Sequence, residues 1–150
     1  EKFPCLKILM NHFPTSGNTC KTHRVSIRHA HASMVSIGKQ FISEKAKNTI
    51  LDRKNKCYIC IASLWEIAIK IKLEKLSIDT RFEELADLLH QNDIEILPIT
   101  FEHICNLFDL EEVHRDPFDR IIISTAKTES IPVITKDKNF GSYENIEVIW

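Results

Sequence analysis

A chain of 150 residues is long enough for one domain with a buried core. Its 43% hydrophobic and 27% charged residues fit a globular protein, and a formal net charge of −1 gives no global reason to expect a polyanion or a membrane as partner. No apolar run approaches the roughly 20 residues of a membrane span. The five cysteines are scattered and odd in number, which argues against a disulfide framework and predicts a reducing, cytoplasmic location.

Residues 1–40 differ in charge from the rest of the chain. They hold six basic residues and one acid, a balance of +5, and four of the seven histidines. The remainder therefore holds 14 basic (20 − 6) and 20 acidic (21 − 1) residues, a balance of −6. The first segment also lacks a hydrophobic period of 2 or 3.6, so no helix or strand is predicted there.

From residue 43 onward the chain alternates between helix and strand patterns. The strand patterns are uninterrupted apolar runs, which indicates a parallel sheet covered by helices on both faces. The predicted elements are a helix over 43–52 with Ser43 as N-cap, a strand over 56–62, helices over 63–76 and 81–91, a strand over 94–99, a helix over 100–110 capped by Thr100, a helix over 117–129 starting with Pro117, and strands over 132–135 and 146–150.

The pair Cys57 and Cys60 forms a CxxC within the apolar run "CYICIAS". A structural zinc site needs a second ligand pair, and the chain has no other CxxC. We therefore favour two cysteines buried in a strand over a redox or metal site.

Two acids begin helices in patterns that have two interpretations. Ser63-x-x-Glu66 is a formal capping box, and Asp116-x-x-Asp119 resembles one. Each later acid also starts a stripe at helical spacing: Glu66 is followed by residues 69 and 73, and Asp119 by residues 123 and 126. If those stripes face the core, an unpaired carboxylate is costly there. A site is then favoured over a cap for Glu66 and Asp119, while Asp116 stays divided between the two.

A third acid, Asp137, directly follows the strand pattern "PVIT". Open α/β sheets bind ligands at the carboxyl ends of their strands. Carboxylates gathered there repel one another unless a cation lies among them, and oxygen ligands suit Mg²⁺ or Mn²⁺. Such ions promote phosphodiester hydrolysis, which is the chemistry that we predict.

The motifs "SLWEIAIKIKLEKL", "HRDPFDRIIISTA" and "VITKDKNF" occur in this order. Together, over about residues 43–150, they resemble the PIN-domain ribonucleases of the VapC toxin type. The resemblance implies a three-layer α/β/α sandwich with a central parallel sheet. It also implies a Mg²⁺- or Mn²⁺-dependent endoribonuclease that cleaves single-stranded RNA as the toxin of a toxin–antitoxin pair, with the cognate antitoxin and a second copy of the chain as protein partners.

In that family an acidic quartet binds the metal. The resemblance assigns three of its members to Glu66, Asp119 and Asp137, and Asp116 to a further acid beside the third. The supporting residues that it implies are Thr135, which orders the last acid, and Ser63; nearby candidates for RNA phosphate contacts are Arg120, Lys136 and Lys138.

The fourth acid has no match, because the family begins with an apolar central strand that ends in an Asp. A permitted codon choice for residues 28–35 ("RHAHASMV"), continuing into Ser36 and read one base later, encodes Asp-Thr-His-Thr-Leu-Leu-Trp-Phe, which resembles that motif. We therefore interpret residues 1–40 as an out-of-frame segment and residues 41–150 as the PIN-like domain, with the first strand lost or replaced.

Two rival functions follow from the missing acid and the capping patterns. One is a PIN remnant that binds RNA or antitoxin without cleaving. The other, which we favour least, is a nonenzymatic α/β module whose acids are all helix caps.

Overall fold

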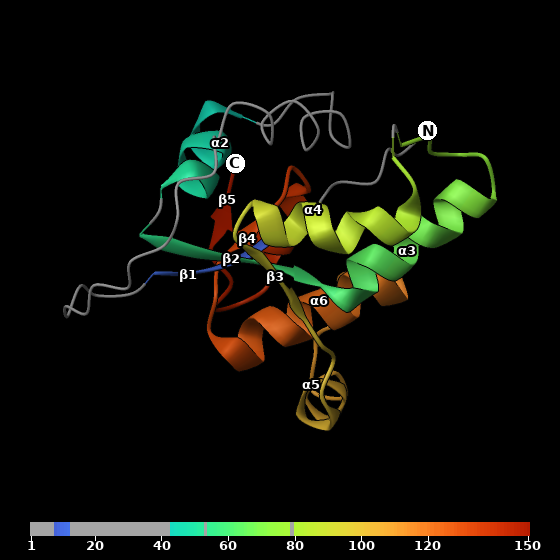
Figure 1. The fold of residues 1–150 in the computed structure, drawn as a ribbon. Helices are drawn as coiled ribbons and strands as arrows, with labels where there is room; N and C mark the ends of the chain where they lie inside the picture. The colour runs from blue at the N-terminus through green and yellow to red at the C-terminus, as the bar shows by residue number, and fades with distance from the viewer. Residues whose placement is uncertain (1–7, 13–42, 53, 79) are drawn as a thin grey trace.

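A computed structural model describes residues 8–12, 43–52, 54–78 and 80–150 (Figure 1). Its core is a five-stranded sheet with the strand order β3-β2-β1-β4-β5. Strands β2 and β3 are parallel, and so are β4 and β5. The strands are β1 Ile8–His12, β2 Asn55–Cys60, β3 Ile94–Leu97, β4 Val133–Ile134 and β5 Val148–Ile149.

The central strand β1 corrects the expectation of a purely parallel sheet. It pairs antiparallel with both neighbours, Ile8 lying opposite Ile59 of β2 and Ile134 of β4. The start of β1 therefore lies at the carboxyl edge of the parallel strands, and its end, His12, lies opposite Asn55 at the other edge. Strand β1, from within residues 1–40, thus occupies the central position that the resemblance gives to the first strand but does not run parallel to its neighbours. The segment "RHAHASMV" lies outside the described residues, so the proposed change of frame stays a prediction.

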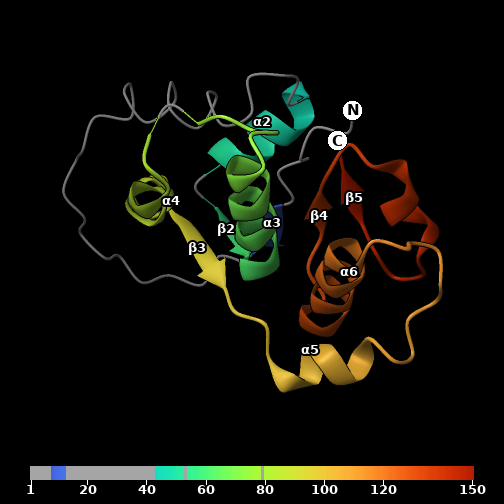
Figure 2. The same ribbon diagram turned by 90° about the vertical axis from the view of Figure 1, so that its right-hand side faces the viewer.

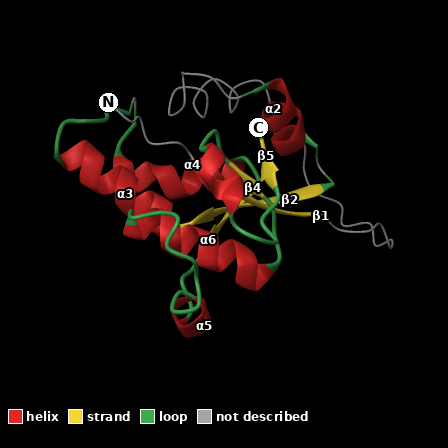
Figure 3. Ribbon diagram, turned by 180° about the vertical axis from the view of Figure 1, so that it is seen from behind, coloured by secondary structure: helices red, strands yellow, loops and turns green. Residues whose placement is uncertain are grey.

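Helices cover both faces of the sheet and complete the three layers. Figure 2 shows α2 and α4 on one side and α5 and α6 on the other, and Figure 3 shows the same arrangement from behind. One hydrophobic cluster joins the sheet to α2, α3 and α4, and a second joins it to α6 and the segment after β4. The helices are α2 Glu44–Leu51, α3 Ile61–Lys72, α4 Leu85–Gln91, α5 Phe101–Asn106 and α6 Pro117–Glu129.

Three helix starts lie where capping residues predicted them, whereas α3 and α5 each end four residues earlier than predicted, at Lys72 and Asn106. Ser43 and Thr100 cap α2 and α5 through their side-chain oxygens, and α6 begins at Pro117 as expected. The start of α3 was predicted two residues too late, at Ser63 instead of Ile61. The cause is composition, because Ile61 and the alanine after it continue the apolar run of β2, and an apolar run alone does not separate strand from helix.

The two cysteines of the CxxC lie in β2 and are buried, as expected. Cys57 packs in the first cluster and Cys60 in the second, so their side chains serve opposite faces of the sheet. Burial raises the pKa of the Cys57 thiol to about 11 and also raises that of Cys60. Thiols that stay protonated are poor nucleophiles and poor metal ligands, which agrees with a purely structural role.

Candidate metal centre

The beginning of α6 is built around Asp116. Its backbone is extended, and its Oδ1 accepts a hydrogen bond of 2.8 Å from the backbone N–H of Phe118. Pro117 occupies the first helical position, where a missing N–H costs nothing. The Asp116 side chain is thus an exposed N-cap, which places Asp119 on the first turn of the helix and facing inward, with a side chain only 14% exposed.

The loop before α6 is tied down by Arg120. Its guanidinium donates to the carbonyl oxygens of Glu111 at 3.1 Å and Leu110 at 3.3 Å. These bonds connect the chain ahead of His114 to the first turn of α6. Two of its five donors therefore serve the loop, and a contact with RNA phosphate stays a prediction for this residue.

Asp137 stands at the carboxyl end of β4, as predicted. Its backbone N–H donates to Oγ1 of the fully buried Thr135 at 3.2 Å. Its own Oδ1 accepts from the backbone N–H of Asn139 at 3.0 Å, where a short 3-10 helix begins. Both ends of this turn are fixed by hydrogen bonds, so the other carboxylate oxygen, Oδ2, is held in position. Lys136 and Lys138 flank it and are exposed.

The structure brings Asp119 and Asp137 together with a residue that the sequence interpretation missed. His114, Asp119 and Asp137 each offer one ligand atom, and these atoms lie within 4.8 Å of one another. His114 Nε2 is 3.7 Å from Asp137 Oδ2 and 4.0 Å from Asp119 Oδ2. The signal in the sequence was the histidine itself, which opens the motif "HRDPFDR" two residues before Asp116.

The His114 imidazole is buried and held by two aromatic rings. It stacks on Tyr143 with a centroid distance of 5.6 Å and meets Phe140 edge-on at 5.1 Å. The Tyr143 hydroxyl accepts from the backbone N–H of His114 at 2.9 Å and lies 3.3 Å from Nδ1. With Nδ1 turned to the tyrosine, Nε2 is the nitrogen that faces the two carboxylates.

The Glu66 side chain makes a different contact, although its helix α3 lies close to α6. Among the described residues it is not a member of this group of three, and its Oε1 pairs with Lys70 Nζ at 2.5 Å. The helices do meet near their N-terminal ends, because Trp65 contacts Phe118 edge-on with ring centroids 5.2 Å apart. Convergence of Glu66 with the other two acids therefore stays a prediction.

The residues that follow Glu66 at helical spacing do not face the core, contrary to the prediction. Ile69 is 36% exposed and Leu73 is 56% exposed, whereas Ile123 and Ala126, which follow Asp119, are buried. The α3 helix buries its other side, and both of its long faces contain apolar residues. Because of this, periodicity could not show which side faces the core.

Ser63 is not a capping residue, contrary to the capping-box pattern. The N-cap of α3 is Cys60, which makes no side-chain cap bond, and Ser63 is the third residue of the helix. Its Oγ is buried and has no hydrogen-bond partner among the described residues. Glu66 therefore lies in the second turn, beyond the reach of a capping box, so the cap interpretation no longer accounts for that acid.

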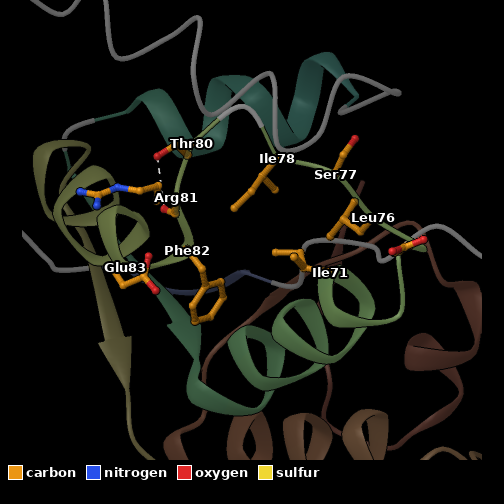
Figure 4. A pocket seen from close by; sticks show the side chains of 9 residues that line it. Ile71, Leu76, Ser77, Ile78, Thr80, Arg81, Phe82 and Glu83 are labelled. Atoms are coloured by element: carbon orange, nitrogen blue, oxygen red, sulfur yellow. Dashed lines mark hydrogen bonds between the residues drawn. The ribbon is translucent and has the colours of Figure 1, made fainter.

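A separate cavity of about 520 Å³ lies between the end of α3 and the start of α4. Figure 4 shows Ile71, Ile78 and Phe82 directed toward it, with Arg81 and Glu83 at the rim. None of its lining residues belongs to the group of His114, Asp119 and Asp137. Its lining mixes apolar side chains with polar and charged ones.

The donor set at the carboxyl edge fits a divalent cation. One buried imidazole nitrogen and two carboxylate oxygens converge there, and two acids this close repel each other without a positive charge between them. Such an ion activates water and offsets charge on a phosphoryl group when bound.

The sequence matches the family model of the PIN domain over residues 37–145. The chain belongs to the PIN-domain family, whose members are generally metal-dependent nucleases. No curated protein and no solved structure gives a significant match. In the part of the chain that the structure describes, no helix has the length and apolar character needed to cross a membrane.

Proposed function

We propose that this chain derives from a metal-dependent endoribonuclease that cleaves single-stranded RNA. The observation that supports this most is the group of His114, Asp119 and Asp137 at the carboxyl edge of the sheet of a PIN domain. In this proposal the two carboxylates hold Mg²⁺ or Mn²⁺, and the exposed Lys136 and Lys138 contact the RNA phosphates on either side of Asp137.

Each residue has a distinct part in this arrangement. The bond from the Asp137 N–H to Thr135 fixes the last acid, and the Asp116 cap fixes the first turn of α6. A rigid first turn holds the Asp119 carboxylate in place before substrate arrives, so little reorganisation is needed during the reaction. The supporting contacts therefore contribute to rate by fixing the acids, and Asp119 and Asp137 contribute by ligation.

A second candidate is a PIN remnant that binds RNA or antitoxin and cleaves poorly. Two observations favour it. The antiparallel β1 ends at the edge remote from Asp137, so it does not carry an acid to the site as a parallel first strand does. The Glu66 carboxylate is also engaged with Lys70.

The biological setting is proposed from the resemblance to VapC toxins alone. In it, the chain is the cytoplasmic toxin of a toxin–antitoxin pair, its partner is the cognate antitoxin, and it forms a homodimer. The described apolar side chains that remain exposed on and directly after α3 and α5, such as Trp65, Leu73, Phe101 and Phe108, are suited to protein contacts.

The deciding experiment compares the chain with Asp119→Asn on a mixed pool of single-stranded RNA, with Mg²⁺, with Mn²⁺ and with EDTA. Asp87→Asn, at an exposed acid in the first turn of α4, is the matched control. We expect cleavage that needs metal, is lost in Asp119→Asn and is kept in Asp87→Asn. RNA binding without cleavage by the unmodified chain would establish the second candidate instead.

A further chain, in which the frame over residues 28–36 is restored, tests the reason for any weak activity. Loss of one preorganised electrostatic group commonly costs about 10²–10³ in rate. Restoration should therefore increase metal-dependent cleavage by that order. Equal rates for the original and restored chains would show that no acid is missing from the site.

A further inference from the structure

We infer that His114 is a direct ligand of the metal ion, through Nε2, and that it makes the site prefer a transition-metal ion to Mg²⁺. This inference rests on the proposed metal site and adds a nitrogen donor to its two carboxylates. It concerns a residue that the acidic pattern of the site does not include.

The distances from His114 to the two carboxylates fit ligands of one ion. Bonds from nitrogen or oxygen to small divalent ions are about 2.1 Å long, so two ligands of one ion lie at most about 4.2 Å apart. Nε2 lies 3.7 Å from Asp137 Oδ2 and 4.0 Å from Asp119 Oδ2, within that limit. The ligand atoms of all three residues lie within 4.8 Å of one another.

The surroundings of His114 prepare its ring for this role. A metal-bound histidine usually donates its other ring N–H to an oxygen, which fixes the tautomer and the ring orientation. The Tyr143 hydroxyl, 3.3 Å from Nδ1, is able to accept that bond. The Nε2 lone pair then points at the two carboxylates. The stack on Tyr143 and the edge contact with Phe140 hold the ring plane in this direction.

The donor types decide the ion. Mg²⁺ prefers oxygen and retains its waters, whereas imidazole nitrogen is a better ligand for first-row transition ions. A neutral nitrogen also adds a ligand without adding to the repulsion between Asp119 and Asp137. In a chain with no match for the fourth family acid, His114 thus supplies a third donor from within the described fold.

The test measures metal binding without RNA. The full chain, stripped of metal, is titrated with Mn²⁺ by electron paramagnetic resonance, alone and in competition with Mg²⁺. We expect Mn²⁺ to bind at least tenfold more tightly than Mg²⁺. His114→Gln should lower the Mn²⁺ affinity about 10–100-fold, in the range found for lost contacts around metal sites, and change that for Mg²⁺ little. The control is His90→Gln, an exposed histidine on α4, which should change neither affinity.

A spin-echo measurement of the Mn²⁺-loaded chain tests the bond itself. A histidine nitrogen bound to the ion gives a ¹⁴N coupling, which should persist in His90→Gln and vanish in His114→Gln. Tight Mn²⁺ binding without ¹⁴N coupling would overturn the inference and leave the proposed site of carboxylates intact. If neither the unmodified chain nor Asp119→Asn binds Mn²⁺, both this inference and the proposed metal site are wrong.

Discussion

The N-terminal parts of α6 and α3 show how similar sequence patterns lead to different structures. Both carry an acid three residues after a capping type of residue, and both continue with apolar residues. In α6 the cap forms at Asp116, and the stripe after Asp119 is buried. In α3 the expected cap, Ser63, lies inside the helix, and the stripe after Glu66 is exposed.

The difference shows that a helix start is fixed by what ends the preceding element. Before α6 stands a polar loop with a proline at the first helical position, so one starting point is favoured. Before α3 stands β2, whose apolar run continues into the helix without a break. An acid can be assigned to cap or site only after the start of its helix is known.

The largest expected contrast in stability is between the two stripes. Ile123→Ala should lower the free energy of unfolding by about 2–5 kcal/mol, because it leaves a cavity beside α6 in a fully buried position. Ile69→Ala, on the exposed stripe of α3, should cost less than about 1 kcal/mol. Urea unfolding of both variants measures this, and equal losses would place Ile69 in the core after all.

Strand β2 and helix α5 each carry a cysteine, Cys57 and Cys105, and we expect the two to affect the pH dependence of stability differently. The folded pKa of Cys57, about 11, lies above its ordinary value of 9.0 because the thiol is buried. The stability gained by burying the neutral thiol is therefore complete below pH 9 and is lost as the pH rises through 11. That loss amounts to about 2–3 kcal/mol.

Cys57→Ala should therefore flatten the decline of unfolding free energy between pH 9 and 11, whereas Cys105→Ala, on the exposed surface of α5, should leave it unchanged. Urea titrations at a series of pH values give the slope. A slope that both variants alter equally would contradict the burial of Cys57.

The two predicted caps should respond in opposite directions. Asp116→Ala removes the bond to the Phe118 N–H and should cost about 1 kcal/mol of stability. Ser63→Ala removes a buried hydroxyl without a hydrogen-bond partner among the described residues and should be neutral or slightly stabilising. Thermal unfolding of the pair tests this, and a destabilised Ser63→Ala would reveal a bond to that hydroxyl.

An effect of similar size is expected where the two helices meet. The edge-on contact between Trp65 and Phe118 should contribute about 0.5–1.5 kcal/mol beyond area burial, and Trp65 is 62% exposed. A double-mutant cycle of Trp65→Ala and Phe118→Ala isolates that term. A coupling energy of zero would mean that the N-terminal ends of α3 and α6 are independent.

Local signals were sufficient to predict most of the elements and two of the three clustered site residues. Ser43, Thr100 and Pro117 each mark a helix start by a specific backbone requirement, and Asp119 and Asp137 stand at positions that a parallel sheet brings to one edge. The alternation of strands and helices likewise predicted the layered fold.

The remaining features depend on contacts between distant parts of the chain. His114 joins the acids only because Tyr143, 29 residues further on, positions its ring and backbone. The direction of β1 depends on pairing with β2 and β4, and its own sequence has no apolar period that indicates it. Neither feature leaves a pattern within one element, which is why sequence inspection missed both.

The central claim is that the acids at the start of α6 and the end of β4 hold a divalent ion. The most direct test is the position of Mn²⁺ in a crystal of the full chain, located by its anomalous scattering. We expect one ion within bonding distance of the carboxylates of Asp119 and Asp137, with the Asp116 side chain still accepting a hydrogen bond from the Phe118 N–H. A crystal in which Mn²⁺ lies away from both carboxylates, or in which no ion is bound at saturating Mn²⁺, would contradict it.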